Sequence, residues 1–275
     1  MRKHLINLAS AAIFLAFTIS GHSQDNTNLA LGNPSGATTD TAYPENYLMN
    51  KPQYSLSYNN KKHIPNWVSW HVSSTDLGSF SRQNNFRPDP SLPSGWYQVK
   101  PSDYAKTGFD KGHQCPSGDR TSSGENNSAT FLMTNMVPQA PNNNRITWEH
   151  LESFCRKLVG QGNELYIICG VYGQGGSGSQ GSANEINHQV VVPADLWKIV
   201  VVLPEGNNDV SRIDTNTRII AVFIPNNQEC SQKSWGEYRV SVDKLQELTG
   251  YDFLSNVPTD IQKVIEVKVD SGETN

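Results

Sequence analysis

Five short segments rich in β-branched residues limit what this 275-residue chain can fold into. Each is bounded by Pro, Gly or Asn, which is typical of β-strands, and several are apolar on both faces, as in the interior of a sheet. The segments are residues 66–72, 165–170, 189–193, 197–204 and 218–225. Together with the helical patterns that follow, they predict an α+β fold with a central, largely antiparallel sheet flanked by helices.

Helical periodicity is strongest after "PNNN", from about Arg145 to Val159. At about 100° per residue, four apolar side chains share one narrow sector, which predicts the face turned to the sheet. They are Trp148, Leu151, Cys155 and Leu158. Two shorter helices are expected near the C-terminus. One begins at the N-cap Ser241 and ends before Gly250, and the other begins near Asp260.

The polar residues of the long helix have two interpretations. Asn144 projects onto the buried sector, and Glu152 and Arg156 line its edge. The remaining polar positions, Glu149, Ser153 and Lys157, are expected to face solvent. An ordinary amphipathic helix with a Glu/Arg pair explains this pattern. An amide, a carboxylate and a guanidinium along a buried margin also suit a metal-assisted phosphate site.

A second chemically suggestive stretch is "DKGHQCPSGDR", residues 110–120, in which His113 lies in a turn-rich sequence. A single histidine in such a loop is more often structural than catalytic, so His113 needs support from other residues. Four further histidines have no partner at a recognisable spacing and are expected to be structural or solvated. They are His63, His71, His150 and His188.

The first residues predict export. Arg2 and Lys3 precede a short apolar run and then small residues, so residues 1–23 are typical of a cleavable secretory signal peptide. No later stretch is apolar for the roughly 20 residues that a membrane-spanning helix needs, so no membrane association is expected. Residues 24–45 are expected to be a flexible leader and residues 46–270 a single domain, with a flexible surface loop at 173–182.

Charge limits how this chain could attract a polyanion. Without Arg2 and Lys3, 20 of the 22 basic residues remain against 26 acidic ones, a net charge of −6. A nucleic-acid partner would therefore depend on a local cluster of basic side chains, helped by a bound cation.

The cysteines leave two alternatives open. Cys115, Cys155, Cys169 and Cys230 could form two disulfides in any of three pairings after export. Buried free thiols are at least as consistent with the apolar surroundings of Cys155 and Cys169.

Taken together, "DKGHQCPSGDRT" and "ATFLMTNMVPQAPNNNRITWEHLESFCRKL" resemble the DNA/RNA non-specific endonucleases of the ββα-metal type. The likeness is greatest to the secreted bacterial sugar-non-specific nucleases and extends from about Tyr54 to "SVDKLQELTGYDFLSNVPTDIQ". D-[RK]-G-H alone is a weak signal. Joined to T-N-M-x-P-Q, N-x-x-x-W and L-E at their spacings, it is specific. The resemblance implies a ββα-metal finger nuclease fold for residues 46–270.

The resemblance also implies catalytic roles at matching positions. His113 corresponds to the general base, and Glu152 to a carboxylate that holds water on the metal ion. Arg82 and Arg156 correspond to arginines that contact the phosphate. Arg87 lies five residues after Arg82 and is the alternative for that role.

Three further positions concern metal and substrate. Asn144 corresponds to the one protein ligand of a hydrated Mg²⁺, for which Mn²⁺ could substitute. Lys111, which is expected to contact the substrate, stands where the family usually has Arg. Lysine keeps the positive charge but cannot donate two parallel hydrogen bonds to a phosphate, as a guanidinium can. Asn135 is expected near the bound substrate in a supporting role. Cys115 replaces a residue that is commonly small.

With the signal peptide, which directs the chain to the periplasm or the medium, these roles predict a secreted or periplasmic, Mg²⁺-dependent nuclease. It would hydrolyse DNA and RNA without sequence preference and leave 5′-phosphates. Neutral imidazole can take a proton from water near neutral pH. An alternative is a weakened or inactive nuclease-like domain that binds extracellular nucleic acid. A serine hydrolase lacks support because no G-x-S-x-G occurs. Cleavage of small nucleotides as a side activity stays open, and no pattern identifies a protein inhibitor.

Overall fold

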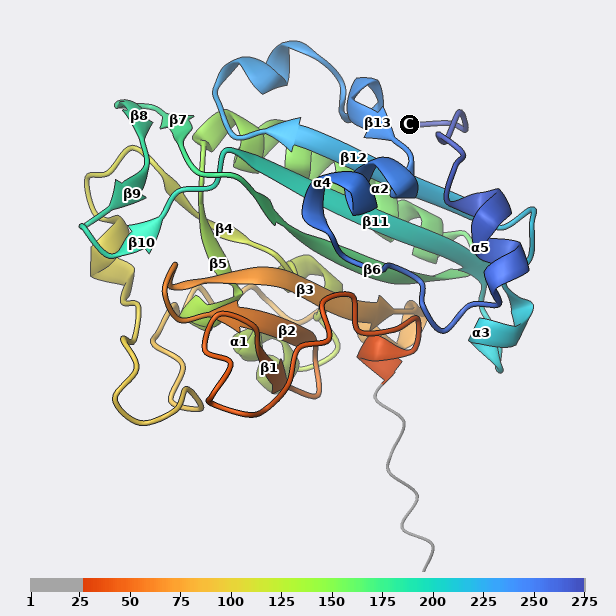
Figure 1. Ribbon diagram of the computed structural model, residues 1–275, viewed down its shortest axis with the longest axis horizontal. Helices are drawn as coiled ribbons and strands as arrows, with labels where there is room; N and C mark the ends of the chain where they lie inside the picture. Colours follow the sequence, from red (N-terminus) through yellow and green to blue (C-terminus); the bar gives the residue numbers. More distant parts are fainter. Residues whose placement is uncertain (1–26, 275) are drawn as a thin grey trace, which may run out of the picture.

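A computed structural model of the chain describes residues 27–274 and is built on one seven-stranded antiparallel sheet (Figure 1). The expected signal peptide, residues 1–23, lies outside the described residues. In spatial order the strands are β1 (Tyr47–Asn50), β2 (Ser55–Asn59), β3 (Ile64–Val72), β6 (Asn163–Tyr172), β11 (Asp195–Pro204), β12 (Arg218–Pro225) and β13 (Arg239–Val240). The prediction of an α+β fold with a central antiparallel sheet is confirmed.

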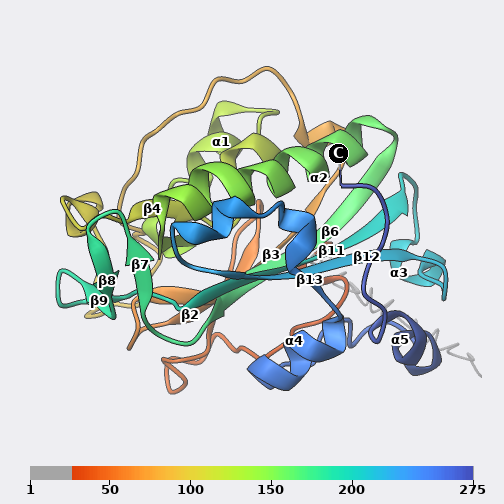
Figure 2. The same cartoon turned by 90° about the horizontal axis from the view of Figure 1, so that it is seen from above.

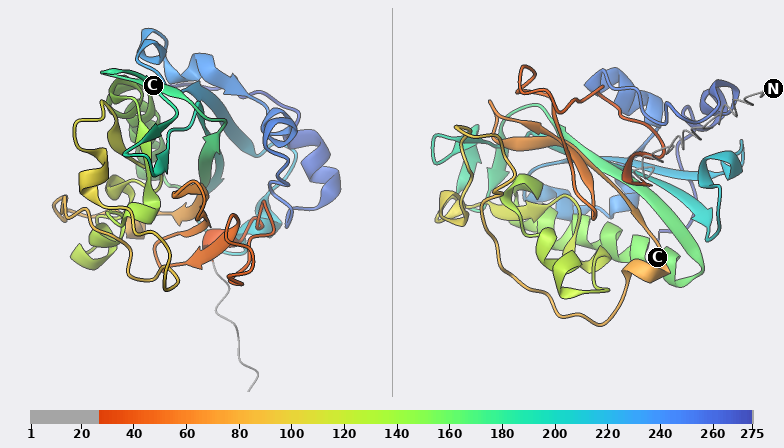
Figure 3. Two further views of the ribbon diagram at one scale, coloured as in Figure 1. Left: turned by 60° about the vertical axis from the view of Figure 1, so that its left-hand side comes forward. Right: turned by 90° about the horizontal axis from the view of Figure 1, so that it is seen from below.

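Helices cover both faces of this sheet (Figure 2). The helix α2 (Glu149–Gly160) lies over one face with α1 (Gly124–Ala129), while α4 (Val242–Thr249) and α5 (Thr259–Ile265) lie over the other. The short helix α3 (Asp209–Arg212) follows β11. Alternate residues of β11 therefore contribute to two hydrophobic clusters, because successive side chains of a strand point to opposite faces. Figure 3 shows the same layers from two further sides.

A small ββα unit lies on the α2 side of the sheet. Strand β4 (Asp110–His113) pairs with β5 (Met136–Gln139), and a π-helical turn, η6 (Asn143–Trp148), leads directly into α2. A Cβ at Gly112 would lie 2.1 Å from Oε1 of Gln139, so the close pairing of the two strands requires glycine there. This pairing places His113 at the end of β4, beside the first turns of the helix.

The terminal helices agree with their sequence signals. The Ser241 side chain caps α4 by accepting a hydrogen bond from the backbone N–H of Lys244 at 3.1 Å. Gly250 ends this helix with a φ of 70°, a left-handed conformation that favours glycine. The last helix begins at Thr259, one residue before the expected start near Asp260.

Three local expectations differ from the structure. The segment 189–193 contributes only β10 (Val190–Val191), which pairs with β9 (Glu185–Ile186) outside the main sheet. The expected flexible loop 173–182 contains most of a short hairpin of β7 (Gly176–Gly178) and β8 (Gly181–Ala183). The helix predicted from Arg145 starts earlier and passes through the π-turn η6, so the regular projection does not hold for its first residues.

The expectation of a flexible leader at 24–45 is wrong for residues 27–45. Ala37 is buried in the cluster beneath α4 and α5. The indole of Trp67 donates a hydrogen bond to Oγ of Ser35 at 2.8 Å, and Thr38 forms a bridge with Tyr47. Polar composition suggested a loose segment, but these side-chain hydrogen bonds hold it against the sheet.

The structure decides between disulfides and free thiols for the cysteines. All four cysteines are buried free thiols. Burial raises the pKa of Cys155 and of Cys169 to about 12, so their reactive thiolates are disfavoured.

Across residues 27–274, no helix has the length and apolarity required to cross a bilayer.

Candidate active site

Segments far apart in the sequence meet in an open cleft of about 520 Å³. Its lining residues come from the loop before β4, from β4 and the loop after it, and from η6 and α2. Six of the seven predicted site residues line it, namely Arg82, Lys111, His113, Asn144, Glu152 and Arg156. The lining also includes Ser117, Gly118, Thr121, Asn127, Arg145, Glu149 and Pro116.

His113 forms part of the cleft wall and is almost fully buried. Its ring makes edge contacts with Phe131 and Phe86, at centroid distances of 4.9 and 5.5 Å. Burial, followed by the charges of Arg82 and Lys111, lowers the pKa of His113 to about 3. Its Nε2 is enclosed without a hydrogen-bond partner among the described residues. The imidazole is therefore neutral at physiological pH and able to accept a proton.

Asn144 is held by Asp110, a residue that sequence reasoning did not single out. The Asn144 amide nitrogen donates to Oδ2 of Asp110 at 2.9 Å. Arg145 binds the same carboxylate through Nε and Nη2, at 2.8 and 2.6 Å. The amide N–H₂ is thereby engaged, and the amide oxygen is left to accept a bond or bind a cation.

Glu152 and Arg156 follow on the next turns of α2. Burial raises the pKa of Glu152 to about 7, although the positive charges of Lys198 and Arg156 act to lower it. Glu149, which was expected to face solvent, has a side chain that is 47% exposed and also borders the cleft. Its carboxylate accepts from Ser153 and lies 3.8 Å from Nη2 of Arg156. Ser153 is exposed, as expected.

Arg156 is fixed from the loop that follows His113. Its Nη1 donates to Oδ1 of Asp119 at 3.2 Å, and a Cβ at Gly118 would lie 2.8 Å from that same nitrogen. The absence of a side chain at Gly118 therefore allows the guanidinium to approach this loop. The second oxygen of the buried Asp119 accepts from the indole N–H of Trp70 on β3 at 3.0 Å.

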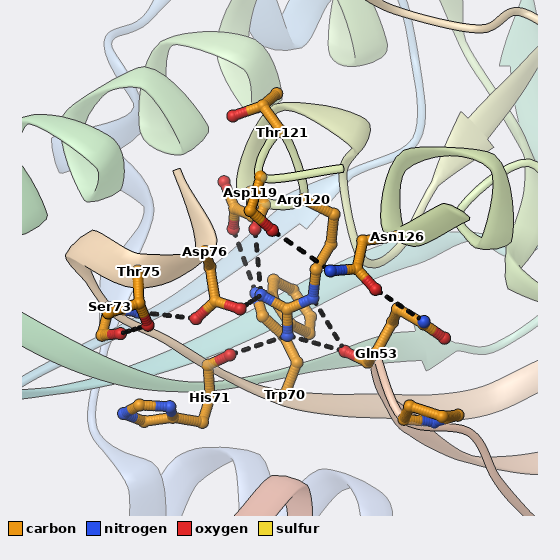
Figure 4. A network of polar contacts seen from close by, with 12 residues as sticks. Gln53, Trp70, His71, Ser73, Thr75, Asp76, Asp119, Arg120, Thr121 and Asn126 are labelled. Carbon is orange, nitrogen blue, oxygen red and sulfur yellow. Dashed lines mark hydrogen bonds and ion pairs between the residues drawn. The ribbon is translucent and has the colours of Figure 1, made fainter. Parts of the chain in front are cut away.

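The neighbouring Arg120 fastens the same loop to the sheet (Figure 4). Its buried guanidinium donates to the backbone carbonyls of Gln53 and His71 at 2.6 and 2.7 Å, and Nη1 lies 3.3 Å from Asp76. Because a buried charge is stable only when its donors are satisfied, this network gives the loop a defined position.

The structure distinguishes the two candidate arginines. Arg82 lines the cleft, where its Nη1 donates to Oγ of Ser117 and its guanidinium lies 4.9 Å from the centre of the Phe131 ring. Arg87 instead donates to the backbone carbonyl of Ser128 at 2.9 Å and is not part of the cleft lining. The geometry therefore favours Arg82 for contact with a ligand in the cleft.

Lys111 and Asn135, the two residues predicted to bind substrate, differ in whether they line the cleft. Lys111 lines the cleft, with Nζ 4.8 Å from the centre of the Phe86 ring. Asn135 is fully buried outside the lining, so its assignment to substrate binding is wrong. Its amide bonds to both the N–H and the carbonyl of Cys115, at 2.9 and 2.8 Å. Its amide nitrogen also donates to the Thr130 carbonyl at 2.9 Å, so this side chain fixes the backbone two residues after His113, which agrees with a supporting role.

The four histidines expected to be structural lie outside the cleft lining within the described chain. His71 forms a different cluster, in which ligand atoms of His71, Glu164 and Asp209 lie within 4.8 Å of one another. Arg212 already contacts both carboxylates. A cation there would have to displace or oppose this guanidinium, so the cluster is better described as an ion-pair network.

The cleft suits a hydrated divalent cation better. Asn144 and Glu152 present oxygen atoms to it, and within residues 27–274 neither the Asn144 amide oxygen nor the Glu152 carboxylate accepts a hydrogen bond from the protein. Mg²⁺ prefers oxygen ligands and keeps several waters, so few protein groups are needed.

Sequence reasoning missed three supporting residues. Asp110 and Asp119 stand within the quoted motif and could have been found there. Lys198 is the single charge inside the apolar strand "WKIVVVLP", which is also a recognisable signal.

The antiparallel β4–β5 pair, the helix that follows it and the cleft that they line, with its buried neutral histidine, define a nuclease of the ββα-metal class. The family model for DNA/RNA non-specific endonucleases matches residues 32–260. The chain belongs to this family and is a metal-dependent nuclease acting on DNA and RNA.

Individual relatives agree with this assignment. A nuclease from Nostoc sp. is 54% identical over 244 residues, which are 89% of this chain and 86% of that protein. The mitochondrial nuclease EXOG of Danio rerio is 32% identical over 72% of this chain, which spans only 58% of that protein. The fold is similar to that in a crystal structure of the EndoG/EndoGI complex, described as showing the mechanism of EndoG inhibition. The TM-score is 0.68 at 21% identity, covering 84% of this chain and 91% of that one.

Proposed function

We propose that this chain is an exported, Mg²⁺-dependent nuclease that cleaves DNA and RNA without sequence preference and leaves 5′-phosphate ends. The observation that carries the proposal is the meeting of His113, Asn144, Glu152 and two arginines in one cleft. Export rests on the signal-peptide pattern of residues 1–23.

His113 is the proposed general base. The imidazole is neutral at physiological pH, so a ring nitrogen can take a proton from a water molecule that attacks the phosphorus. The bond from phosphorus to the 3′ oxygen then breaks, and this oxygen takes a proton from a second water molecule to leave a 3′-hydroxyl. Arg82 and Arg156 contact the phosphate and stabilise the charge that develops on it.

Asn144 would hold the divalent cation through its amide oxygen, and Glu152 would hold water on that cation. When bound, the cation would neutralise charge on the phosphate and on the departing oxygen. Asp110 orients Asn144 for this task by holding its amide nitrogen. Since the cleft offers cationic and hydroxyl groups that suit phosphates, the proposed cleavage depends little on base identity.

The test is digestion of plasmid DNA and of RNA by the wild-type protein and by His113→Ala, each with Mg²⁺ and with excess chelator. The proposal requires wild-type cleavage of both polymers that stops with chelator and falls by orders of magnitude in the variant. End labelling of the products identifies the 5′-phosphate. Binding without cleavage would favour the alternative, an inactive nucleic-acid-binding domain.

A further inference from the structure

Lys198 is a buried cation at the centre of the sheet, directly below the cleft. It lies on β11, pairs in register with Cys169 and Val222, and is only 1% exposed. Its neighbours on the same face of the strand, Leu196 and Val200, belong to the hydrophobic core. An ammonium group in such surroundings is costly unless a specific contact compensates for its lost hydration.

Hydrogen bonds do not provide this compensation. Nζ of Lys198 is buried without a hydrogen-bond partner among the described residues. Instead, it lies 4.2 Å from the centre of the Trp148 ring and 5.8 Å from that of Trp70. These aromatic faces attract the cation, but such contacts offset only part of the cost of removing an ammonium group from water.

The acidic group within ion-pair distance is Glu152. Its Oε1 lies 3.9 Å from Nζ of Lys198, which is longer than a hydrogen bond. The pair is therefore coupled by charge, and the carboxylate oxygens stay available to the cleft. Both tryptophans also belong to the site's framework, because Trp148 ends the π-turn that contains Asn144 and Trp70 donates to Asp119.

We propose that Lys198 is a positioning residue for the nuclease, whose ammonium fixes the Glu152 carboxylate at the cleft and supplies its buried counter-charge. The inference rests on the proposed function of Glu152 in holding water on the cation. It explains why a charge is kept where an apolar side chain of the same length would cost less to bury.

Lys198→Met tests this role, because methionine keeps a similar length but removes the charge. Binding of Mn²⁺ to the metal-stripped protein is measured by calorimetry, which needs no catalysis. We expect the affinity to fall by roughly tenfold or more, as is usual for residues that support metal-binding groups. Thermal stability should change little, because the cost of burying the ammonium is removed while Glu152, without its counter-charge, can take up a proton. Lys198→Arg should recover part of the affinity.

A matched control is Lys233→Met. Lys233 is an exposed lysine whose Nζ lies 5.9 Å from the centre of the Tyr238 ring, outside the cleft. Its loss should leave Mn²⁺ binding unchanged. A second comparison adds Lys198→Met to Glu152→Gln. If Lys198 acts through Glu152, the double variant should bind Mn²⁺ no more weakly than Glu152→Gln, within about twofold.

Three results would overturn the role. One is a folded Lys198→Met protein with wild-type Mn²⁺ affinity. Another is an equal loss of affinity when Lys198→Met is added to the wild type and when it is added to Glu152→Gln. The third is failure of both Lys198→Met and Lys198→Gln to fold, which would make the residue structural. If the wild type itself neither binds Mn²⁺ nor cleaves nucleic acid, the proposed function fails. If the wild type binds Mn²⁺ and cleaves nucleic acid, and Lys198→Met binds Mn²⁺ equally well, the proposed function stands but Lys198 is not a positioning residue.

Discussion

The Asp110 carboxylate accepts a hydrogen bond from the Asn144 amide at 2.9 Å and thereby joins the first residue of β4 to the π-turn that precedes α2. His113 ends the same strand, so one short segment carries both the proposed base and the group that orients the proposed metal ligand. The wider π-turn separates Asn144 from the regular spacing of α2, and such turns are frequent at functional sites.

Asp110→Ala should therefore weaken the metal site without removing a ligand. The freed Asn144 amide could rotate, and the loss of such support typically costs about 10- to 100-fold in metal affinity or activity. A Mg²⁺ titration of cleavage checks this, with the exposed Asp252→Ala as a control. An unchanged titration in Asp110→Ala would show that the contact does not orient the ligand.

His113→Ala should lower turnover by about 10²- to 10⁴-fold, the usual contribution of a general base. The melting temperature and the Mg²⁺ dependence should change much less. Single-turnover cleavage of a labelled oligonucleotide measures the chemical step. Near-normal cleavage by a folded variant would rule out His113 as the base.

Arg82→Ala and Arg87→Ala should differ sharply. Removing Arg82 takes a cation from the cleft and should lower turnover roughly 100-fold. Removing Arg87 takes away its backbone hydrogen bond to Ser128 and should cost about 1 kcal/mol of stability with little effect on turnover. The cleavage rate and the melting temperature of both variants are measured in parallel. Small and equal effects on the rate would mean that neither arginine binds the phosphate.

The acid limb of the pH–rate profile should reflect Glu152 rather than His113. Burial holds the pKa of Glu152 at about 7 in the metal-free protein, while that of His113 is about 3. Below pH 7, Glu152 must lose its proton before it can hold water on the cation, so activity at limiting Mg²⁺ should fall as the pH decreases. Raising Mg²⁺ should move this limb to lower pH. A limb near pH 6.5 at every Mg²⁺ concentration would instead indicate titration of His113.

The lowered pKa of His113 makes the free energy of unfolding depend on pH in the opposite direction from a carboxyl group whose pKa is raised. The folded-state pKa of about 3 lies below the reference value of about 6.5, so the unfolded state binds more protons between these values. The contribution of His113 to stability is thus present above pH 6.5 and is lost as the pH falls toward 3. His113→Gln should flatten this part of the dependence, as measured by denaturant unfolding across pH. An identical slope in the variant would show that His113 is not the group responsible.

Four of the five predicted strands form the core of the sheet because continuous apolar runs can be buried on both faces. The segment 189–193 has the same composition, but tertiary structure gives it only a two-residue pairing. Residues 27–45 were misjudged for the opposite reason. Their polar side chains bond to distant partners such as Trp67, and these contacts leave no local periodicity.

The site was predictable where a motif fixed both residue and spacing, as for His113 and Glu152. The exposure of Glu149 was predictable, but its contacts with Arg156 and Ser153 at the edge of the cleft were not. Asn135 was assigned to substrate because its proximity to the site could be inferred, whereas its hydrogen bonds to the backbone of Cys115 and Thr130 could not. Such details depend on the loop after His113, whose position is set by Arg120 and Asp119.

The most direct measurement of the central claim is anomalous diffraction from a crystal of the protein soaked with Mn²⁺. We expect one ion in the cleft, within about 2.2 Å of the Asn144 amide oxygen and on the side that His113 and Glu152 face. An ion bound instead among His71, Glu164 and Asp209, with the cleft empty at full Mn²⁺ occupancy, would contradict it.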